Sequence, residues 1–115
     1  MMDVIPFVLG FAGLLVLVIG YLGRIERLPR NSVAGVRTVA SMRSDAAFRA
    51  ANKAAGVPTM IAGVAGITGG VGVWLVPEAG VTVTLVTAAA LLALAVTGGV
   101  KGSRAANAVN DQEPG

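Results

Sequence analysis

Cysteine and histidine are both absent from this chain of 115 residues, and only 13% of its residues are charged. Their absence excludes disulfide bonds, thiolate nucleophiles and the usual zinc ligands. A soluble domain has about 25% charged residues, so the charge content points away from that class. The sequence also has no paired-carboxylate arrangement, no nucleophile with a neighbouring base and no glycine-rich phosphate loop. We therefore expect no enzyme activity, no metal and no cofactor.

Charge is missing entirely from three long apolar segments, residues 4–23, 54–77 and 79–100. A helix needs about 20 apolar residues to cross a hydrocarbon core of about 30 Å. The first segment could be read as a cleaved signal peptide, but its basic cluster follows it, as in an uncleaved anchor. Carriers coupled to protons or ions need a titratable group at membrane depth, and these segments contain no Asp, Glu, Lys, Arg or His. The chain is therefore predicted to be an integral membrane protein, and a small carrier is disfavoured.

The fold class predicted is an all-α membrane protein with three transmembrane helices in a single membrane domain, residues 1–115. The segments expected are a first span at 4–23, a basic loop at 24–43, a short amphipathic helix at 44–55, a second span at 57–76, a turn at 77–80, a third span at 81–100 and a tail at 101–115.

Orientation follows from the basic residues, because Lys and Arg accumulate on the cytoplasmic side of a membrane. Seven of the nine lie between the first and second spans, and the other two follow the third span. The turn at 77–80 has none. We expect the N-terminus outside, the basic loop and C-terminal tail in the cytoplasm, and the turn outside. The net charge of +3 is then a topology signal and not a sign of nucleic-acid binding. The polar tail is expected to fray.

Small residues predict where the spans pack, because helices in lipid associate through close backbone approach. The second span has Ala62, Gly66 and Gly70 at four-residue spacing, and the third has Ala89 and Ala93. These residues are the predicted packing positions. The spacing leaves open whether the partner is another span of the same chain or a second copy.

The amphipathic helix at 44–55 begins with good capping chemistry. Ser44 is a favourable N-cap, and Asp45 suits the positive end of the helix dipole. Asp45 and Arg49 form a predicted i,i+4 ion pair. The opposite face is apolar and is expected to lie in the acyl boundary of the membrane. Gly56, followed two residues later by a proline, predicts a break before the second span.

The stretch RNSVAGVRTVASMRSDAAFRAANKAAG, residues 30–56, resembles the signature loop of the SdpI family of small bacterial membrane proteins. That family includes the immunity protein against the sporulation-delaying toxin. The matching positions are Asn31, Gly35, Val36, Arg37, Thr38, Ser44, Asp45, Asn52, Lys53 and Gly56. The resemblance implies a multi-pass protein of the bacterial plasma (inner) membrane, without enzyme activity or cofactor. It implies immunity or membrane-stress protection through binding.

Two roles remain open for the loop. In the first, Arg37 bridges carbonyls or a lipid phosphate, Gly35 adopts a backbone angle denied to other residues, and Asn31 and Asn52 close the loop onto span ends. In the second, the same residues recognise a partner. The expected partners are membrane lipids and a peptide or protein, with a homo-oligomer or a larger complex also open. The alternative function is an accessory subunit that packs into a larger membrane complex through its small-residue stripe.

Overall fold

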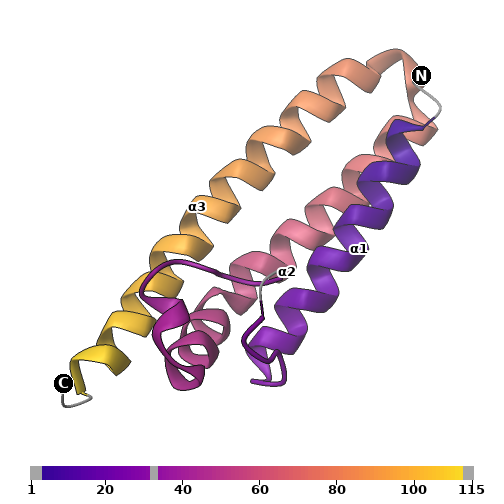
Figure 1. Ribbon diagram of the computed structural model, residues 1–115. Helices are drawn as coiled ribbons and strands as arrows, with labels where there is room; N and C mark the ends of the chain where they lie inside the picture. The colour runs from indigo at the N-terminus through magenta and orange to yellow at the C-terminus, as the bar shows by residue number, and fades with distance from the viewer. Residues whose placement is uncertain (1–3, 32–33, 113–115) are drawn as a thin grey trace.

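The structure is a computed structural model that describes residues 4–31 and 34–112. It is built from long helices joined by a folded loop and a tight turn (Figure 1). The elements are α1 (Ile5–Arg24), η1 (Ser41–Arg43), α2 (Asp45–Leu75), η2 (Pro77–Ala79) and α3 (Gly80–Gln112). The three α-helices are long and apolar enough to cross a membrane, which confirms the all-α, three-span prediction. The predicted outer segment before residue 4, loop residues 32–33 and tail residues 113–115 lie outside the described residues.

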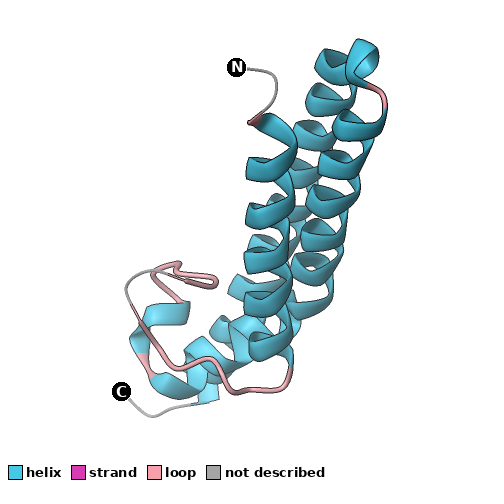
Figure 2. Ribbon diagram, turned by 90° about the vertical axis from the view of Figure 1, so that its right-hand side faces the viewer, coloured by secondary structure: helices cyan, strands magenta, loops and turns pink. Residues whose placement is uncertain are grey.

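Helix α2 lies between the other two. Both α1 and α3 pack along it, and within the described residues α1 and α3 make no contact with each other. The bundle is elongated, with extents of 57 × 21 × 20 Å. The loop between α1 and α2 folds around one end of the bundle, which also carries the C-terminus (Figure 2). We call this the loop end.

The interface between α1 and α2 is built from glycine. A Cβ added to Gly66 would lie 3.0 Å from Gly13 Cα, and one added to Gly70 would lie 2.6 Å from the carbonyl oxygen of Pro6. Ala62, on the same face, is 7% exposed. The stripe of Ala62, Gly66 and Gly70 therefore meets another span of the same chain.

The predicted packing positions on α3 do not meet another span of this chain, and packing against a second copy stays a prediction. Ala89 and Ala93 are exposed, and the face that meets α2 instead carries Thr87, Gly98 and Ala106, which are buried. Both faces of α3 are rich in small residues, so spacing alone does not tell which of them meets α2.

The predicted break at Gly56 was also wrong, because α2 runs without interruption for 31 residues. At a rise of 1.5 Å per residue it is about 46 Å long, which exceeds a hydrocarbon core of about 30 Å. A proline inside a helix costs about 3 kcal/mol or more. Here both neighbours pack on the same turns: a Cβ at Gly56 would lie 2.7 Å from Arg24 Cβ, and one at Gly98 would lie 3.8 Å from Pro58 Cβ. This packing holds the helix together across the proline.

The tail, expected to fray, instead continues α3 as helix to Gln112. Its Ala106 is fully buried and packs with Ala47 and Ala51 of α2. Phe48 on the same side of α2 is also fully buried. The apolar face at 44–55 is therefore covered by α3 and the loop, and the prediction that it enters the acyl boundary is corrected. Protein packing removes that face from water without needing lipid.

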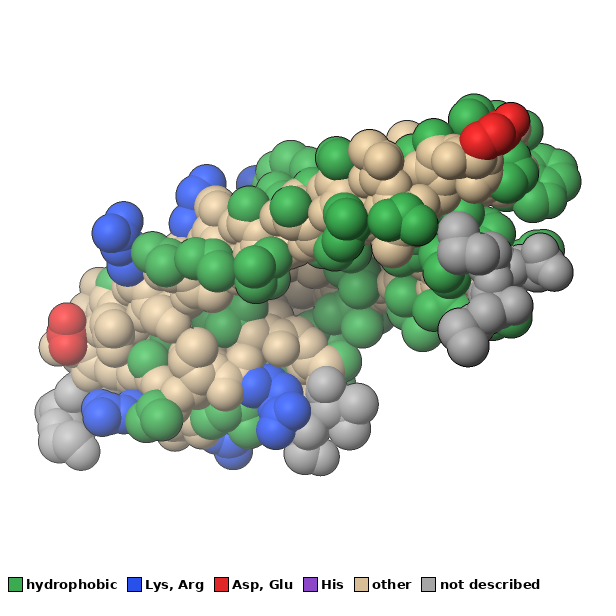
Figure 3. Space-filling view, turned by 90° about the horizontal axis from the view of Figure 1, so that it is seen from above, with side chains coloured by type: hydrophobic (Ala, Val, Ile, Leu, Met, Phe, Trp, Pro, Cys, Tyr) green, Lys and Arg blue, Asp and Glu red, His purple; other side chains and the backbone are tan. Residues whose placement is uncertain are grey.

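Charge is unevenly distributed over the surface. On the face in Figure 3, Lys and Arg side chains gather toward the loop end, and hydrophobic side chains cover much of the rest. This agrees with the basic cluster in the sequence. The orientation of the bundle across a membrane stays a prediction.

Candidate functional site

The loop that resembles a signature motif begins with a side-chain turn. The Asn31 Oδ1 atom accepts a hydrogen bond from the Ala34 N–H at 2.7 Å, and its Nδ2 donates to the Pro29 carbonyl at 2.7 Å. An asparagine that bonds to main chain two or three residues away fixes a turn locally. Asn31 therefore shapes the loop from within.

Gly35 and Asn52 join the loop to α2. Gly35 has φ +93°, and an added Cβ would lie 2.5 Å from Asn52 Oδ1. This is a position where glycine is required by both backbone conformation and space. The next residue, Val36, donates its N–H to Asn52 Oδ1 at 2.7 Å, while Asn52 Nδ2 donates to the Phe48 carbonyl at 3.0 Å and the Val36 carbonyl at 3.4 Å. Asn52 is only 5% exposed, and its side-chain hydrogen bonds fix the position of the loop on α2. We call this set of contacts the Asn52 clamp.

A second clamp follows at Thr38 and Ser41. The Ser41 hydroxyl donates to the carbonyls of Val36 at 3.0 Å and Thr38 at 2.9 Å as alternative acceptors, and the Thr38 hydroxyl accepts the Ser41 N–H at 3.2 Å. Ser41 is fully buried. Sequence reasoning placed Thr38 in the motif and noted Ser41 only as one of the polar residues of the loop. A small hydroxyl residue just before the helix start was the signal available.

Three contacts between residues distant in the sequence hold the rest of the loop in place. Arg30 donates to the Met42 carbonyl at 3.1 Å and pairs with Asp45 at 3.2 Å. Asn110, near the end of α3, donates to the Ala40 carbonyl at 3.0 Å. The predicted Asp45–Arg49 pair is therefore replaced by a pair between Asp45 and the loop. Sequence reasoning missed Arg30 and Asn110, because their partners are main-chain carbonyls or lie far away in the chain.

Helix α2 begins as predicted. The Ser44 hydroxyl accepts the Ala47 N–H at 3.0 Å, so Ser44 is the N-cap. At the other end of the motif, Gly56 allows the last turn of α1 to approach closely. Most motif residues thus fold the loop and seat it on the helices.

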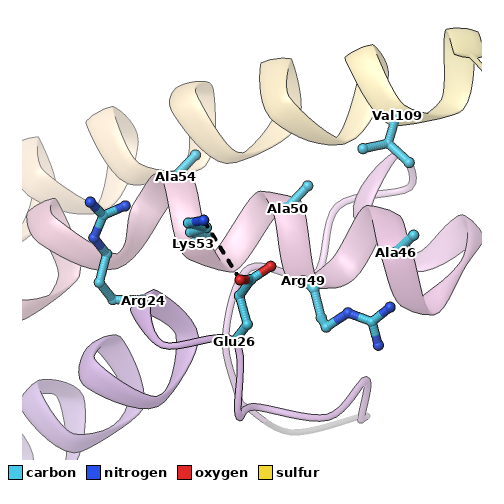
Figure 4. Close-up of a pocket in the computed structure, with 8 residues that line it drawn as sticks. All are labelled: Arg24, Glu26, Ala46, Arg49, Ala50, Lys53, Ala54 and Val109. Carbon is cyan, nitrogen blue, oxygen red and sulfur yellow. Dashed lines mark ion pairs between the residues drawn. The ribbon is translucent and has the colours of Figure 1, made fainter.

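Lys53 lies on a different face of α2, in a surface pocket of about 470 Å³. It pairs with Glu26 at 3.6 Å, and both side chains are 49% exposed. The guanidinium groups of Arg24 and Arg49 lie on opposite sides of this pair and point away from it (Figure 4). These cations do not converge on one point, so the pocket does not form a focused anion site.

Arg37 differs from the rest of the motif. Its side chain is exposed. Within the described residues, neither its guanidinium nor the main-chain N–H groups of Arg37 and Thr38 have a hydrogen-bond acceptor. The residue beside it, Val36, reaches across to α3, where a Cβ at Gly102 would lie 3.2 Å from Val36 Cγ1. The loop therefore bridges from α2 to α3 and holds Arg37 outward on a fixed backbone.

A cavity of about 510 Å³ lies directly beside Arg37. It exists because α1 and α3 do not touch, which leaves a groove between them with α2 at its base. Val16 and Ile19 of α1 line one wall, and Ala95 and Gly99 of α3 line the other. A Cβ at Gly99 would meet nothing within 4 Å, so this wall has room for a larger side chain. Loop residues 34–38 close the groove at the loop end. We call it the lateral groove.

These features define a class of protein: a multi-pass helical membrane protein whose inter-helix loop is folded onto the bundle and presents one arginine at a groove. The SdpI/YfhL protein family model matches residues 27–100, which is more than half of the chain and covers the loop, α2 and most of α3. The chain belongs to this family. No curated protein and no solved structure matches it.

Within the described residues there is no group of three or more acidic, Cys or His side chains placed to hold a metal ion. The described site consists instead of amide and hydroxyl clamps around one exposed cation. Its chemistry is suited to binding an anionic or carbonyl-bearing group.

Proposed function

We propose that this chain is a non-enzymatic protein of the bacterial plasma membrane that protects the cell against a membrane-active peptide or a related membrane stress. It acts by binding a partner at the mouth of the lateral groove. The loop end lies in the cytoplasm in this proposal, as the basic residues predict. Family membership supports the functional class.

The observation that carries the proposal is the contrast between Arg37 and its neighbours. Asn52 and Ser41 are buried and use their polar groups to fix the main chain on both sides of Arg37. Arg37 itself is exposed and lines the groove. A preorganised backbone reduces the entropy lost when a side chain binds, so such a platform favours recognition.

The test is a complementation assay. A strain lacking the gene is challenged with a secreted membrane-active peptide and complemented with the wild type, Arg37→Ala or Arg43→Ala. Arg43 is the matched control, because it is exposed in η1 of the same loop and does not line the groove. We expect Arg37→Ala to lose protection at an unchanged membrane level and Arg43→Ala to keep it. Equal effects of the two variants would mean that only the charge of the loop matters, and unchanged sensitivity on deletion would refute the immunity role.

The alternative, an accessory subunit docked through Ala62, Gly66 and Gly70, loses its proposed surface. Those residues face α1 within the chain, so a partner helix would have to displace α1. No other observation favours this function.

A further inference from the structure

We infer that the partner in the lateral groove is an anionic phospholipid, with an acyl chain between α1 and α3 and its phosphate at Arg37. This inference rests on the proposed function for the biological role of the site, while the binding itself is argued from the groove.

The walls of the groove are apolar, and the polar groups of its lining lie at its base and at the loop end, in the order that a lipid requires. Farthest from the loop end, Val16 and Ala95 are apolar. One helical turn closer to the loop are Ile19 and Gly99, and Thr59 of α2 contributes a hydroxyl at its base. The loop end then presents Arg37 and the main chain of the loop. A phospholipid offers the same sequence of methylenes, ester oxygens and phosphate.

The position of the groove between two membrane-spanning helices favours a lipid as its occupant. It lies between two spans that do not contact each other, so it is bordered by segments predicted to cross the hydrocarbon core. An empty groove at that depth would leave its walls without packing contacts. An acyl chain from the surrounding bilayer fills such a space without unfolding, whereas a peptide would have to bring all of its backbone polar groups with hydrogen bonds satisfied.

Charge at the groove mouth selects the headgroup. The planar donors of the Arg37 guanidinium match phosphate oxygens. The main-chain N–H groups of Arg37 and Thr38 are further donors in the same segment with no acceptor within the described residues. Among described residues, the lining of the groove contains no carboxylate. An anionic headgroup therefore meets donors and no repulsion, while a choline headgroup carries a cation toward Arg37.

The two other pockets considered give weaker grounds for a binding site. The cleft of about 610 Å³ between α2 and α3 at the opposite end, lined by Val64, Gly72 and Val86 among others, has no charged residue to select an occupant. The basic pocket around Lys53 has cations that do not converge (Figure 4).

The test uses the full chain in detergent, titrated with dioleoyl-phosphatidylglycerol or dioleoyl-phosphatidylcholine and followed by native mass spectrometry. The two lipids share acyl chains and differ in headgroup charge. We expect the wild type to bind phosphatidylglycerol at least about tenfold more tightly, and Arg37→Ala to lose most of that preference. Gly99→Leu, which fills the groove, should weaken both lipids about tenfold. The matched controls are Arg43→Ala for charge and Gly10→Leu for bulk, because a Cβ at Gly10 also meets nothing within 4 Å.

The variants give distinct outcomes. If Gly99→Leu leaves binding unchanged, or if both lipids bind the wild type equally, the inferred lipid site is wrong. If Arg37→Ala abolishes protection but leaves phosphatidylglycerol binding intact, the lipid inference fails and the proposed function stands. If the variants lose the lipid and the cell keeps its protection, the lipid site stands and the proposed function fails.

Discussion

The clamp formed by Asn52 gives the most quantitative prediction. Asn52→Ala removes the acceptor of the Val36 N–H, at 2.7 Å, and the donor to the Val36 carbonyl, at 3.4 Å. The helix bond of Phe48 survives, because its carbonyl keeps the main-chain donor of residue 52. The Val36 N–H is partly buried, and an unpaired buried donor costs about 1–3 kcal/mol, so we expect the loop to be destabilised locally by no more than about 2 kcal/mol.

Hydrogen exchange of the full chain in detergent measures this effect at the Val36 amide. A loss of about 2 kcal/mol corresponds to exchange about 30-fold faster, at one factor of ten per 1.4 kcal/mol. Asn110→Ala is the matched control, because it removes the hydrogen bond from the Asn110 side-chain amide to the Ala40 carbonyl, at the other side of the loop. It should change exchange at Val36 by less than about threefold. Unchanged exchange in Asn52→Ala would refute the idea that this side chain fixes the loop.

Three further predictions follow from the packing and the charges. Gly35→Ala should destabilise the loop by about 1–2 kcal/mol in the same exchange experiment, because φ is +93° and the new Cβ would lie 2.5 Å from an oxygen; protection equal to the wild type would contradict this. Gly66→Leu should lower the thermal midpoint in detergent by pushing α1 off α2, while Ala93→Leu on the exposed face should not, and the reverse order would contradict the assigned faces. Because the chain has no cysteine, Glu78→Cys should react with an impermeant maleimide on intact cells and Arg104→Cys only after lysis; the opposite pattern would invert the topology.

Sequence alone predicted what depends on local chemistry. The three spans follow from long uncharged segments, and the Ser44 cap follows from a hydroxyl that bonds three residues ahead. Prediction from the sequence failed where the local structure depends on contacts with residues distant in the chain. The break expected at Gly56 is absent because neighbouring helices pack on both sides of that turn, and the tail becomes helix because Ala106 has Ala47 to pack against.

The candidate site shows the same division. The motif resemblance identified Asn52 and Gly35, but only the fold shows that they belong to one clamp. Ser41 was noted as a polar loop residue but not predicted as a site residue, and Asn110 was missed, because each bonds to a main-chain carbonyl, which no residue pattern encodes. The lateral groove was likewise hidden, because it arises from the absence of contact between α1 and α3.

The central claim is that the buried clamps serve to present Arg37 at the groove. It is tested most directly by a double-mutant cycle in the protection assay, with wild type, Arg37→Ala, Asn52→Ala and the double variant at equal membrane levels. If Asn52 acts by holding Arg37 in place, the double variant will be no more sensitive to the peptide than Arg37→Ala alone. Sensitivity that adds up across the two substitutions would show that they act independently and would contradict the account.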